Sequence, residues 1–406
     1  MNRRLIPTLV LMLIAALIVI DVLPTLASTQ NYWTTKTPMP EYTDPDYCAA
    51  TVLNGKIYAI ASGMFIIYDP ATDTWTENTQ TEIPTHTNSL TTVTCQNKIY
   101  LFKANYENDT IDNQVYDPAF GKWKNKAPKH GEILGLKANA VDGKIYFMGG
   151  YHYVDSKFVV LSSNWAYDPV TDSWSEMAPA PVGASGASTV LDGKIYLIGG
   201  IYNYDDPFKP LYTNLVQIFD PQTNQWSQGK PMFNNLTTMA VAATTGSFAP
   251  KRIYVIGGRS DATNYPIVDF TQIYDPKTDS WSSGASMLTP RISIALVSVN
   301  DKLYALGGWG GFKTNEEYTP ADFNPATSPN QTTALTPSSS QSGEPSPNSP
   351  QTASPKPSTS IPEFPTWTAL PLIATPVLLA IFLAKKRTPP IQKPHVHSNR
   401  PQKGKL

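Results

Sequence analysis

The sequence predicts an all-β domain assembled from six copies of one short motif. Its 406 residues include 37 prolines, 21 tyrosines and 9 tryptophans, while only 16% are charged. This composition favours short strands joined by tight turns over amphipathic helices. The 31 basic and 32 acidic residues nearly cancel, to a formal net charge of −1, and no long basic run precedes residue 380. We therefore expect no nucleic-acid partner.

The N-terminal 27 residues have the pattern of a secretory signal peptide. Two arginines within Met1–Arg4 precede an apolar run that reaches Ile20, and the small residue Ala27 stands before Ser28. A charged start, an apolar core and a small residue at the end are the three parts of such a signal. We expect residues 1–27 to be a signal peptide, with an uncleaved N-terminal anchor as the alternative.

The C-terminal part has the pattern of a tether. Residues 327–366 are rich in Ser, Thr and Pro, which predicts an extended stalk. The uncharged run 367–384 spans about 27 Å at about 1.5 Å per helical residue, enough for one transmembrane helix. Lys385, Lys386 and Arg387 follow at once and place the basic tail, 385–406, in the cytoplasm. The predicted location is the cell membrane, in a single-pass topology with the all-β domain outside.

One short segment before this run resembles a known signal. The sequence Pro362-Glu363-Phe364-Pro365, followed by the apolar run and the basic cluster, resembles the tripartite C-terminal sorting signal of archaeal exported surface proteins. About 19 residues follow the cluster here, more than such signals usually carry. The resemblance implies membrane anchoring and leaves processing of the C-terminus open.

The repeated motif joins an aromatic residue, an Asp-Pro turn and a tryptophan. Six residues separate aromatic from tryptophan in every complete copy, and an apolar strand ending near an Ile-Tyr or Leu-Tyr pair lies upstream. The five complete copies run from Tyr68 to Trp75, Tyr116 to Trp123, Tyr167 to Trp174, Phe219 to Trp226 and Tyr274 to Trp281. The upstream strands of the last four copies, including an incomplete sixth, end in glycine pairs: Gly149 and Gly150, Gly199 and Gly200, Gly257 and Gly258, Gly307 and Gly308.

These residues together resemble the kelch motif, and the likeness extends from about Asn31 to Asn330. The resemblance implies a six-bladed β-propeller over residues 28–326, which allots about 50 residues to each four-stranded blade. The aromatic residues and glycine pairs are then scaffold and not a catalytic set. The first two copies depart from the pattern, with Ala61-Ser62-Gly63 and Phe102-Lys103-Ala104 in place of a glycine pair.

The sixth copy lacks its tryptophan. Its turn, Asp322 to Thr327, leads into the predicted stalk, whereas Trp33 to Pro40 near the N-terminus matches Trp174 to Pro181. We therefore expect an N-terminal strand within residues 31–40 to complete the last blade and close the ring, which removes free sheet edges.

The residues that carry chemistry are sparse. Cys48 and Cys95 fall at opposite ends of neighbouring inner strands, roughly 16 Å apart, which favours two buried thiols over a disulfide. His86, His130 and His152 lie in different copies, so we expect no metal and no cofactor. Relatives of the kelch class include copper-radical oxidases, whose ligand set has no counterpart here. They also include sialic-acid mutarotases. The sialidases form a different six-bladed family, and the arginine triad with which they clamp a carboxylate would have to come from Arg252, Arg259 and Arg291.

The loops that follow the glycine pairs are predicted to share one face. They mix aromatic rings with polar groups, a combination that suits a glycan or a peptide. The candidate ligand-binding residues are Tyr151, His152, Tyr153, Tyr202, Tyr204, Asp205, Arg259, Arg291, Trp309 and Lys313. Asp205 and Asp206 stand beside Pro207 and indicate a turn and not a calcium site. Asn108, Asn235 and Asn330 are glycosylation acceptors.

The function predicted from these features is binding or adhesion at the cell surface, with a glycan or protein as ligand. One alternative is a surface enzyme acting on sugars, of the mutarotase kind. Another is a passive scaffold for a membrane partner, which would use the outer blade edges. A rim of solvated aromatics with no ligand is the fourth reading, and we favour binding over catalysis.

Overall fold

The computed structural model describes residues 31–40, 48–61, 63–78, 89–105, 107–131, 134–154, 157–206 and 209–325. The predicted signal peptide, stalk, membrane span and tail lie outside these ranges, as do His86 and Asn330. Within the described ranges there is no helix with the length and apolar character needed to cross a bilayer.

Six four-stranded antiparallel sheets confirm the all-β propeller prediction. Blade 1 contains β2 (Cys48–Leu53), β3 (Lys56–Ala61), β4 (Met64–Asp69) and β5 (Thr74–Glu77). Blade 2 contains β6 (Leu90–Cys95), β7 (Lys98–Asn105), β8 (Thr110–Asp117) and β9 (Lys122–His130). Blade 3 contains β10 (Ala138–Val141), β11 (Lys144–Met148), β14 (Asn164–Asp168) and β15 (Ser173–Glu176).

The remaining three blades follow the same order. Blade 4 contains β16 (Ser185–Leu191), β17 (Lys194–Asn203), β18 (Leu211–Asp220) and β19 (Gln225–Gly229). Blade 5 contains β21 (Ala240–Ala243), β22 (Ile253–Ile256), β24 (Thr271–Asp275) and β25 (Ser280–Ser283). Blade 6 contains β26 (Ala295–Val299), β27 (Lys302–Leu306) and β28 (Asn315–Thr319), with β1 (Tyr32–Thr35) outermost.

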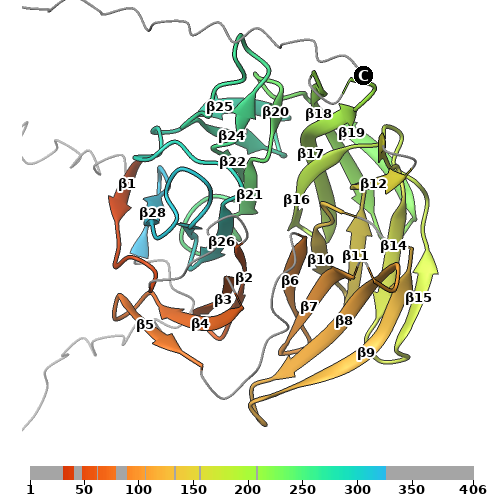
Figure 1. Cartoon of the computed structure of the whole chain (residues 1–406). Coiled ribbons are helices and arrows are strands. Elements are labelled where there is room, and N and C mark those ends of the chain that lie inside the picture. The colour runs from red at the N-terminus through yellow and green to blue at the C-terminus, as the bar shows by residue number, and fades with distance from the viewer. Residues whose placement is uncertain are drawn as a thin grey trace, which may run out of the picture. The chain divides into compact units, whose positions relative to one another are not determined.

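Two additional ribbons lie outside the blades. One pairs β12 (Tyr151–Val154) with β13 (Lys157–Val160), and the other pairs β20 (Leu236–Thr237) with β23 (Arg259–Ser260). Figure 1 shows the first strand of each blade, β2, β6, β10, β16, β21 and β26, around a common axis.

The strand directions define two faces of the propeller. Within a blade, the turn from the first strand to the second and the turn from the third to the fourth lie at one end of the sheet. We call that end the turn face. The links from the second strand to the third, and from each blade to the next, lie at the other end, which we call the loop face. The loops after the glycine pairs are therefore on the loop face, as predicted.

The Asp-Pro turn works as the sequence suggests. The aspartate before the proline accepts a hydrogen bond from the backbone N–H two residues on, at 2.9–3.0 Å in five blades. The same carboxylate forms an ion pair with the basic residue that begins the second strand, for example Lys56 with Asp69 at 3.1 Å. Each turn is thus fixed by its own aspartate and linked to the neighbouring turn of the blade.

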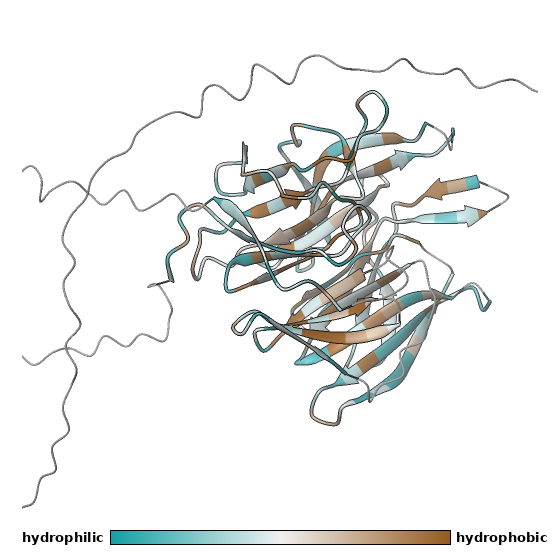
Figure 2. Ribbon diagram, turned by 60° about the vertical axis from the view of Figure 1, so that its left-hand side comes forward, coloured by the Kyte–Doolittle hydropathy of each residue, from teal (hydrophilic) through white to brown (hydrophobic). Residues whose placement is uncertain are grey.

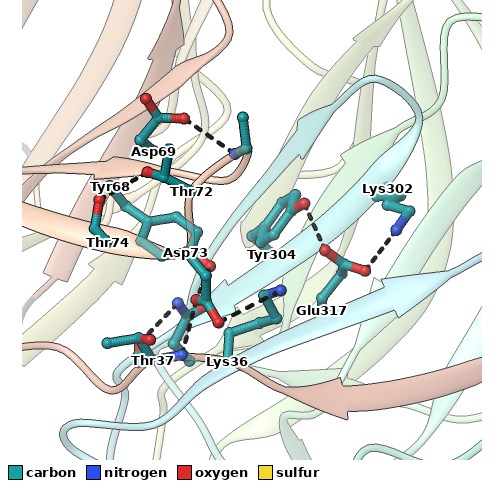
Figure 3. Close-up of polar contacts among 12 residues, drawn as sticks. Lys36, Thr37, Tyr68, Asp69, Thr72, Asp73, Thr74, Lys302, Tyr304 and Glu317 are labelled. Carbon is teal, nitrogen blue, oxygen red and sulfur yellow. Dashed lines mark hydrogen bonds and ion pairs between the residues drawn. The ribbon is translucent and has the colours of Figure 1, made fainter. Parts of the chain in front are cut away.

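A second side chain of the turn joins neighbouring blades, and Figure 3 shows one such joint. Asp73 of blade 1 accepts hydrogen bonds from the Tyr68 hydroxyl at 2.5 Å and from the Thr37 backbone N–H at 2.9 Å. Lys36 lies 3.6 Å from the same carboxylate. The Trp75 indole donates to the Thr37 carbonyl at 2.9 Å. The repeated tyrosine and tryptophan therefore hold one blade to the blade before it.

This joint recurs around the ring. Asp172, Asn224 and Asp279 each accept a backbone N–H of the preceding blade at 2.7–2.9 Å. The tryptophan indoles of four further joints donate to a carbonyl of the preceding blade at 2.7–3.0 Å; these are Trp33, Trp174, Trp226 and Trp281. Trp123 of blade 2 packs against Tyr116, with ring centroids 5.3 Å apart.

The glycine pairs let the next blade approach closely. Gly149 has φ +68°, and a Cβ there would stand 2.1 Å from the Ala184 carbonyl oxygen of the link into blade 4. Gly199 has φ +57°, and a Cβ there would lie 3.1 Å from the Leu236 carbonyl oxygen of the link into blade 5. A Cβ at Gly200, which has φ +95°, would instead lie 2.2 Å from the Ser185 carbonyl oxygen of its own blade. A side chain at Gly149 or Gly199 would therefore push the next blade away, and one at Gly200 would separate the first two strands of blade 4.

The sixth blade takes its outer strand from the N-terminus. β1 runs antiparallel to β28, with Tyr32 opposite Thr319 and Thr35 opposite Glu316. Asn31 occupies the joint position, where its side chain accepts hydrogen bonds from the Ala285 N–H at 2.8 Å and the Tyr318 hydroxyl at 2.7 Å. Both ends of the described domain, at Asn31 and after β28, consequently lie on the turn face.

Candidate ligand-binding face

An axial channel runs between the first strands of the six blades. Its volume is about 610 Å³, and it is lined by small and polar residues such as Ala50, Thr92, Ser188 and Ala242. Each of these strands pairs on one side only, so its unpaired edge points toward the axis. Free backbone groups and hydroxyls make the channel polar. At the loop face it opens into a mouth of about 280 Å³.

A ribbon of blade 3 projects beside this mouth. In β12–β13, Tyr151 faces Val160 and Tyr153 faces Phe158 across the two strands. Figure 2 shows the ribbon extending from the body of the propeller at the right of the view, with β13 mostly in the hydrophobic colour. Tyr153 is 51% exposed, and Val154 and Val159 are also exposed. The ribbon therefore presents apolar side chains to solvent.

Four aromatic rings from blades 3 and 4 pack together at the base of this ribbon. The centroid of Phe158 lies 5.6 Å from Tyr151, 4.9 Å from Tyr153 and 5.0 Å from Tyr204. Tyr151 and Tyr204 are 5.9 Å apart. Burial raises the pKa of the Tyr204 hydroxyl well above its usual range, so that this group remains a neutral donor. We call Tyr151, Tyr153, Phe158 and Tyr204 the aromatic cluster.

A groove separates the ribbon from the hairpin of blade 4. Its volume is about 270 Å³, and its walls are β13 on one side and residues 202–205 on the other. Tyr202 is 42% exposed, and Leu211, near it on the paired strand β18, is 49% exposed. Asn203 and Asp205 hydrogen-bond to one another through their side chains at 2.8 Å, which holds the turn that the sequence predicts there.

The structure brings six of the ten predicted residues together. Tyr151, His152 and Tyr153 lie on β12, and Tyr202, Tyr204 and Asp205 line the groove beside it. Trp309 and Lys313 are exposed in the blade 6 loop, and Trp309 is 47% exposed. Arg259 lies in β23, where its guanidinium donates to the Tyr265 carbonyl at 3.1 Å.

Arg291 is not a surface residue, and its prediction as a ligand-binding group is wrong in this respect. Its side chain is fully buried and forms an ion pair with buried Glu316 at 2.9 Å. It also donates to the Gly307 carbonyl at 2.8 Å. Glu316 lies in β28, whose five residues are all buried. Its counterion is the guanidinium of Arg291, which lies in the link from blade 5 to blade 6.

The three candidate arginines therefore do not converge. Arg252 forms an ion pair with Asp275 at 3.1 Å on the turn face, Arg291 is internal, and Arg259 is bound to backbone. They therefore form no cluster that could clamp a sugar carboxylate in the way of the sialidase arginine triad. In the described residues no group of three or more His, Cys, Asp or Glu side chains is placed to hold a metal ion.

Both cysteines are free thiols. Cys48 and Cys95 lie at opposite ends of β2 and β6, as the repeat alignment predicts. Burial raises the pKa of the Cys48 thiol to about 12 and that of Cys95 to about 11. Neither thiol ionises near neutral pH, so neither is a nucleophile there.

Two glycosylation acceptors are described. Asn108 is exposed in the turn between β7 and β8. The Asn235 side chain is half-buried and donates to the Asp261 carboxylate at 2.6 Å. The site near Asn108 is thus the more accessible of the two to a glycosylating enzyme.

Sequence reasoning missed Phe158, Val159 and Lys137. The first two belong to a run of four residues, Lys157-Phe158-Val159-Val160, whose strand character could have been read from its β-branched and aromatic composition. Lys137 precedes the inner strand of blade 3 and lines both the channel and its mouth. Alignment of the six copies would have exposed it, because most other blades have alanine there.

Comparison with known proteins agrees with this architecture. The model of the kelch motif matches residues 134–181, 184–233 and 247–288, which cover blades 3 and 4 and the last three strands of blade 5. The chain carries kelch motifs. It is 27% identical to Kelch-like protein 25 of Xenopus tropicalis over 52% of this chain and 35% of that protein. It is 26% identical to Kelch-like protein 40 of Mus musculus over 67% of this chain and 43% of that protein.

The matched region is less than half of these kelch-like relatives. A fungal protein, Kelch-like protein terF of Aspergillus terreus, is 27% identical over 50% of this chain and 44% of its own length. Among solved structures, that of YjhT superposes with a TM-score of 0.55 and 17% identity, covering 69% of this chain and 95% of that one. This last similarity establishes the fold and nothing beyond it.

Proposed function

We propose that this kelch propeller is a recognition module displayed at the cell surface, and that its ligand is a protein. Kelch propellers typically serve protein interaction, and the Kelch-like relatives share that domain. The observation that carries the proposal is the exposed apolar ribbon beside the channel mouth. Tyr153, Val154 and Val159 are each more than 40% exposed on a two-stranded ribbon that no fold requirement explains.

The groove suits an extended segment of polypeptide. Among the described strands β13 pairs with β12 alone, so its other edge presents backbone N–H and C=O groups that no described strand pairs with. The groove runs along β13, and the aromatic cluster stands at its base. A strand laid in the groove would pair with this edge and place alternate side chains against the rings of Tyr202 and Tyr204. This is the geometry of β-strand addition.

The position of the chain ends supports display. The described domain begins and ends on the turn face, opposite the ribbon. In this proposal the predicted stalk, residues 327–366, is therefore attached at the face that does not carry the ribbon. The signal peptide, stalk and anchor in this proposal rest on the sequence patterns given above.

The proposal is tested with crosslinking on intact cells that express the full chain. A photoreactive residue at Val159 should form adducts with one dominant protein, and Tyr153→Ala should reduce their yield at least several-fold. Phe120 is the matched control, because it is 77% exposed in a turn of blade 2 on the opposite face. Equal labelling at Val159 and Phe120 would reject the binding face. Resistance of the propeller to protease added to intact cells would reject surface display.

A glycan ligand is the second candidate, and the observation that favours it is in blade 6. Trp309 and Phe312 are 47% and 41% exposed in one short loop, where their rings are available to stack on a sugar. Retention of the full chain on a panel of cell-surface glycans, lost in Trp309→Ala and kept in Tyr153→Ala, would favour this candidate over a protein ligand.

A further inference from the structure

The mouth of the axial channel contains an unusual positive charge. The residues that line it include Lys137, Tyr151, Ser185 and Tyr204, and none of them is acidic. The wall of the channel below is also free of acidic residues among those described, and Lys137 is its one charged member. The side chain of Lys137 is exposed to the solvent of the mouth.

The repeat shows that the fold does not need a lysine here. Lys137 stands four residues before the end of its inner strand, and the same position in blades 1, 2, 4 and 6 holds Ala49, Thr91, Ala187 and Ala295. In blade 5 the strand register places Ala240 there. Five blades therefore fold with alanine or threonine at a position where blade 3 alone has a long cation.

The charge has no counterion among the described residues. All ion pairs found there involve other side chains, and the hydrogen bond at Lys137 is made by its backbone carbonyl, which accepts from the Asn139 amide at 3.2 Å. Solvent reaches the side chain only through the mouth and channel, and the protein atoms around them lower the pKa of the ammonium group by partial desolvation. A concave site of one sign concentrates the field and attracts the opposite charge.

Hydrogen-bond donors surround the same space. Tyr151 and Tyr204 reach the mouth from the aromatic cluster, and the Ser185 hydroxyl lies at the start of β16. Ser89 also lines the mouth, and its hydroxyl oxygen accepts the Gly135 backbone N–H at 3.1 Å. A cation with hydroxyl donors beside it is the set of groups that binds a carboxylate by charge-assisted hydrogen bonds.

We propose that the mouth built around Lys137 binds the carboxylate of an acidic side chain in the ligand segment. This inference rests on the proposed protein-binding function and names the chemistry of one part of the ligand. The mouth adjoins the aromatic cluster through Tyr151 and Tyr204, so one extended segment can contact both. Asp or Glu of that segment would enter the mouth while its apolar neighbours lie along the groove.

The test compares two capped hexapeptides, one of glutamate and one of glutamine, by titration calorimetry with the full chain at low ionic strength. We expect the glutamate peptide to bind at least about tenfold more tightly, as one enclosed charge pair allows. Lys137→Ala, which installs the residue of the neighbouring blades, should abolish the difference, and Lys137→Arg should retain most of it. Lys122→Ala, an exposed lysine on the turn face, is the control and should change nothing.

The outcomes separate this inference from the function on which it rests. No preference for glutamate, or a preference that survives Lys137→Ala, would overturn the carboxylate site. If the Val159 crosslinks also persist unchanged in Lys137→Ala, the proposal of a protein-binding face is retained and only the carboxylate site is rejected. A hexamer of galacturonate serves as a third probe. Lys137-dependent binding of that sugar acid, with none of the glutamate peptide, would reject a peptide carboxylate as the ligand.

Discussion

The buried ion pair of Arg291 and Glu316 gives the sharpest test of the fold, because removal of one partner leaves the other as a buried charge without its counterion. Both side chains are at most 1% exposed, and the guanidinium has further hydrogen bonds to the Gly307 and Thr314 carbonyls at 2.8 and 3.2 Å. Glu316→Leu would leave a buried cation without its counterion. Breaking a buried pair in this way costs about 3–5 kcal/mol.

Replacement of both partners should restore much of this loss. Arg291→Met with Glu316→Leu removes both charges and keeps most of the volume, and such exchanges are often neutral or stabilising. For a domain of this size, a loss of about 4 kcal/mol lowers the melting temperature by roughly 10 °C. Circular dichroism during heating measures the shift. The exposed pair of Lys251 and Asp192 is the control, since Lys251→Ala should cost less than about 1 kcal/mol.

A melting temperature of Glu316→Leu equal to that of the wild type would refute the argument. So would a double variant less stable than the single one. The double variant also decides the role of Arg291 in binding. If Arg291 is purely internal, the double variant should keep the crosslinks at Val159 unchanged.

Three other predictions concern the ring, acid and the thiols. Deletion of residues 31–36 removes β1 and the joint made by Trp33, so we expect a melting temperature lower by at least about 10 °C; unchanged unfolding would show that β1 does not close the ring. Burial acts to raise the pKa of Asp73 and Asp172, but hydrogen bonds from tyrosine and backbone donors bring it below the usual 3.8. A carboxylate whose native pKa is lowered stabilises the fold above pH 3.8, and this stability is lost as the pH falls through the native pKa. The urea concentration at the unfolding midpoint should therefore drop below pH 3.8, and it should drop less steeply in Asp172→Asn. A midpoint that stays constant down to pH 2.5 would contradict this. Iodoacetamide at pH 8 should label Cys48 and Cys95 only after denaturation, and rapid labelling of the native chain would show that the thiols are not protected.

The blades could be predicted from sequence because their determinants are local. An aromatic residue, an Asp-Pro turn and a tryptophan lie within eight residues. The ring contact seen between Tyr68 and Trp75 repeats in all five complete copies, and the hydrogen bond from the tyrosine hydroxyl to an aspartate, as from Tyr68 to Asp73, repeats in blades 3 and 5. The joint to the preceding blade is harder to predict from the sequence. There the side chains of one blade bind backbone N–H and C=O groups that lie about 38 to 50 residues earlier in the chain, as Trp75 binds the Thr37 carbonyl. Backbone partners leave no mark in the sequence.

The site was predicted less well, for reasons that differ between residues. Arg291 follows a proline in an interblade link, a context that usually means exposure, and its burial depends on Glu316, which is 25 residues away. Phe158 belongs to a ribbon inserted into a loop, so the repeat gave no template for it. Tyr151 and Tyr204 could be predicted because they belong to the loops that follow glycine pairs, where the topology alone fixes the face.

Departures from the repeat separate the two faces by role. On the turn face, the long link of blade 5 is held by Asp301, whose carboxylate accepts the Thr245, Phe248 and Ala249 N–H groups at 2.5–3.0 Å. Phe248 then stacks on Phe323, and its carbonyl accepts the Asn324 N–H at 2.6 Å. This departure holds Phe323 and Asn324, which follow the last strand, against the turn face. On the loop face, the departures are the β12–β13 ribbon, the β20–β23 ribbon and Lys137. The β12–β13 ribbon packs on Tyr204 of blade 4, yet Tyr153, Val154 and Val159 remain exposed. Contact between blades accounts neither for these exposed side chains nor for Lys137, which is why we propose ligand recognition on the loop face.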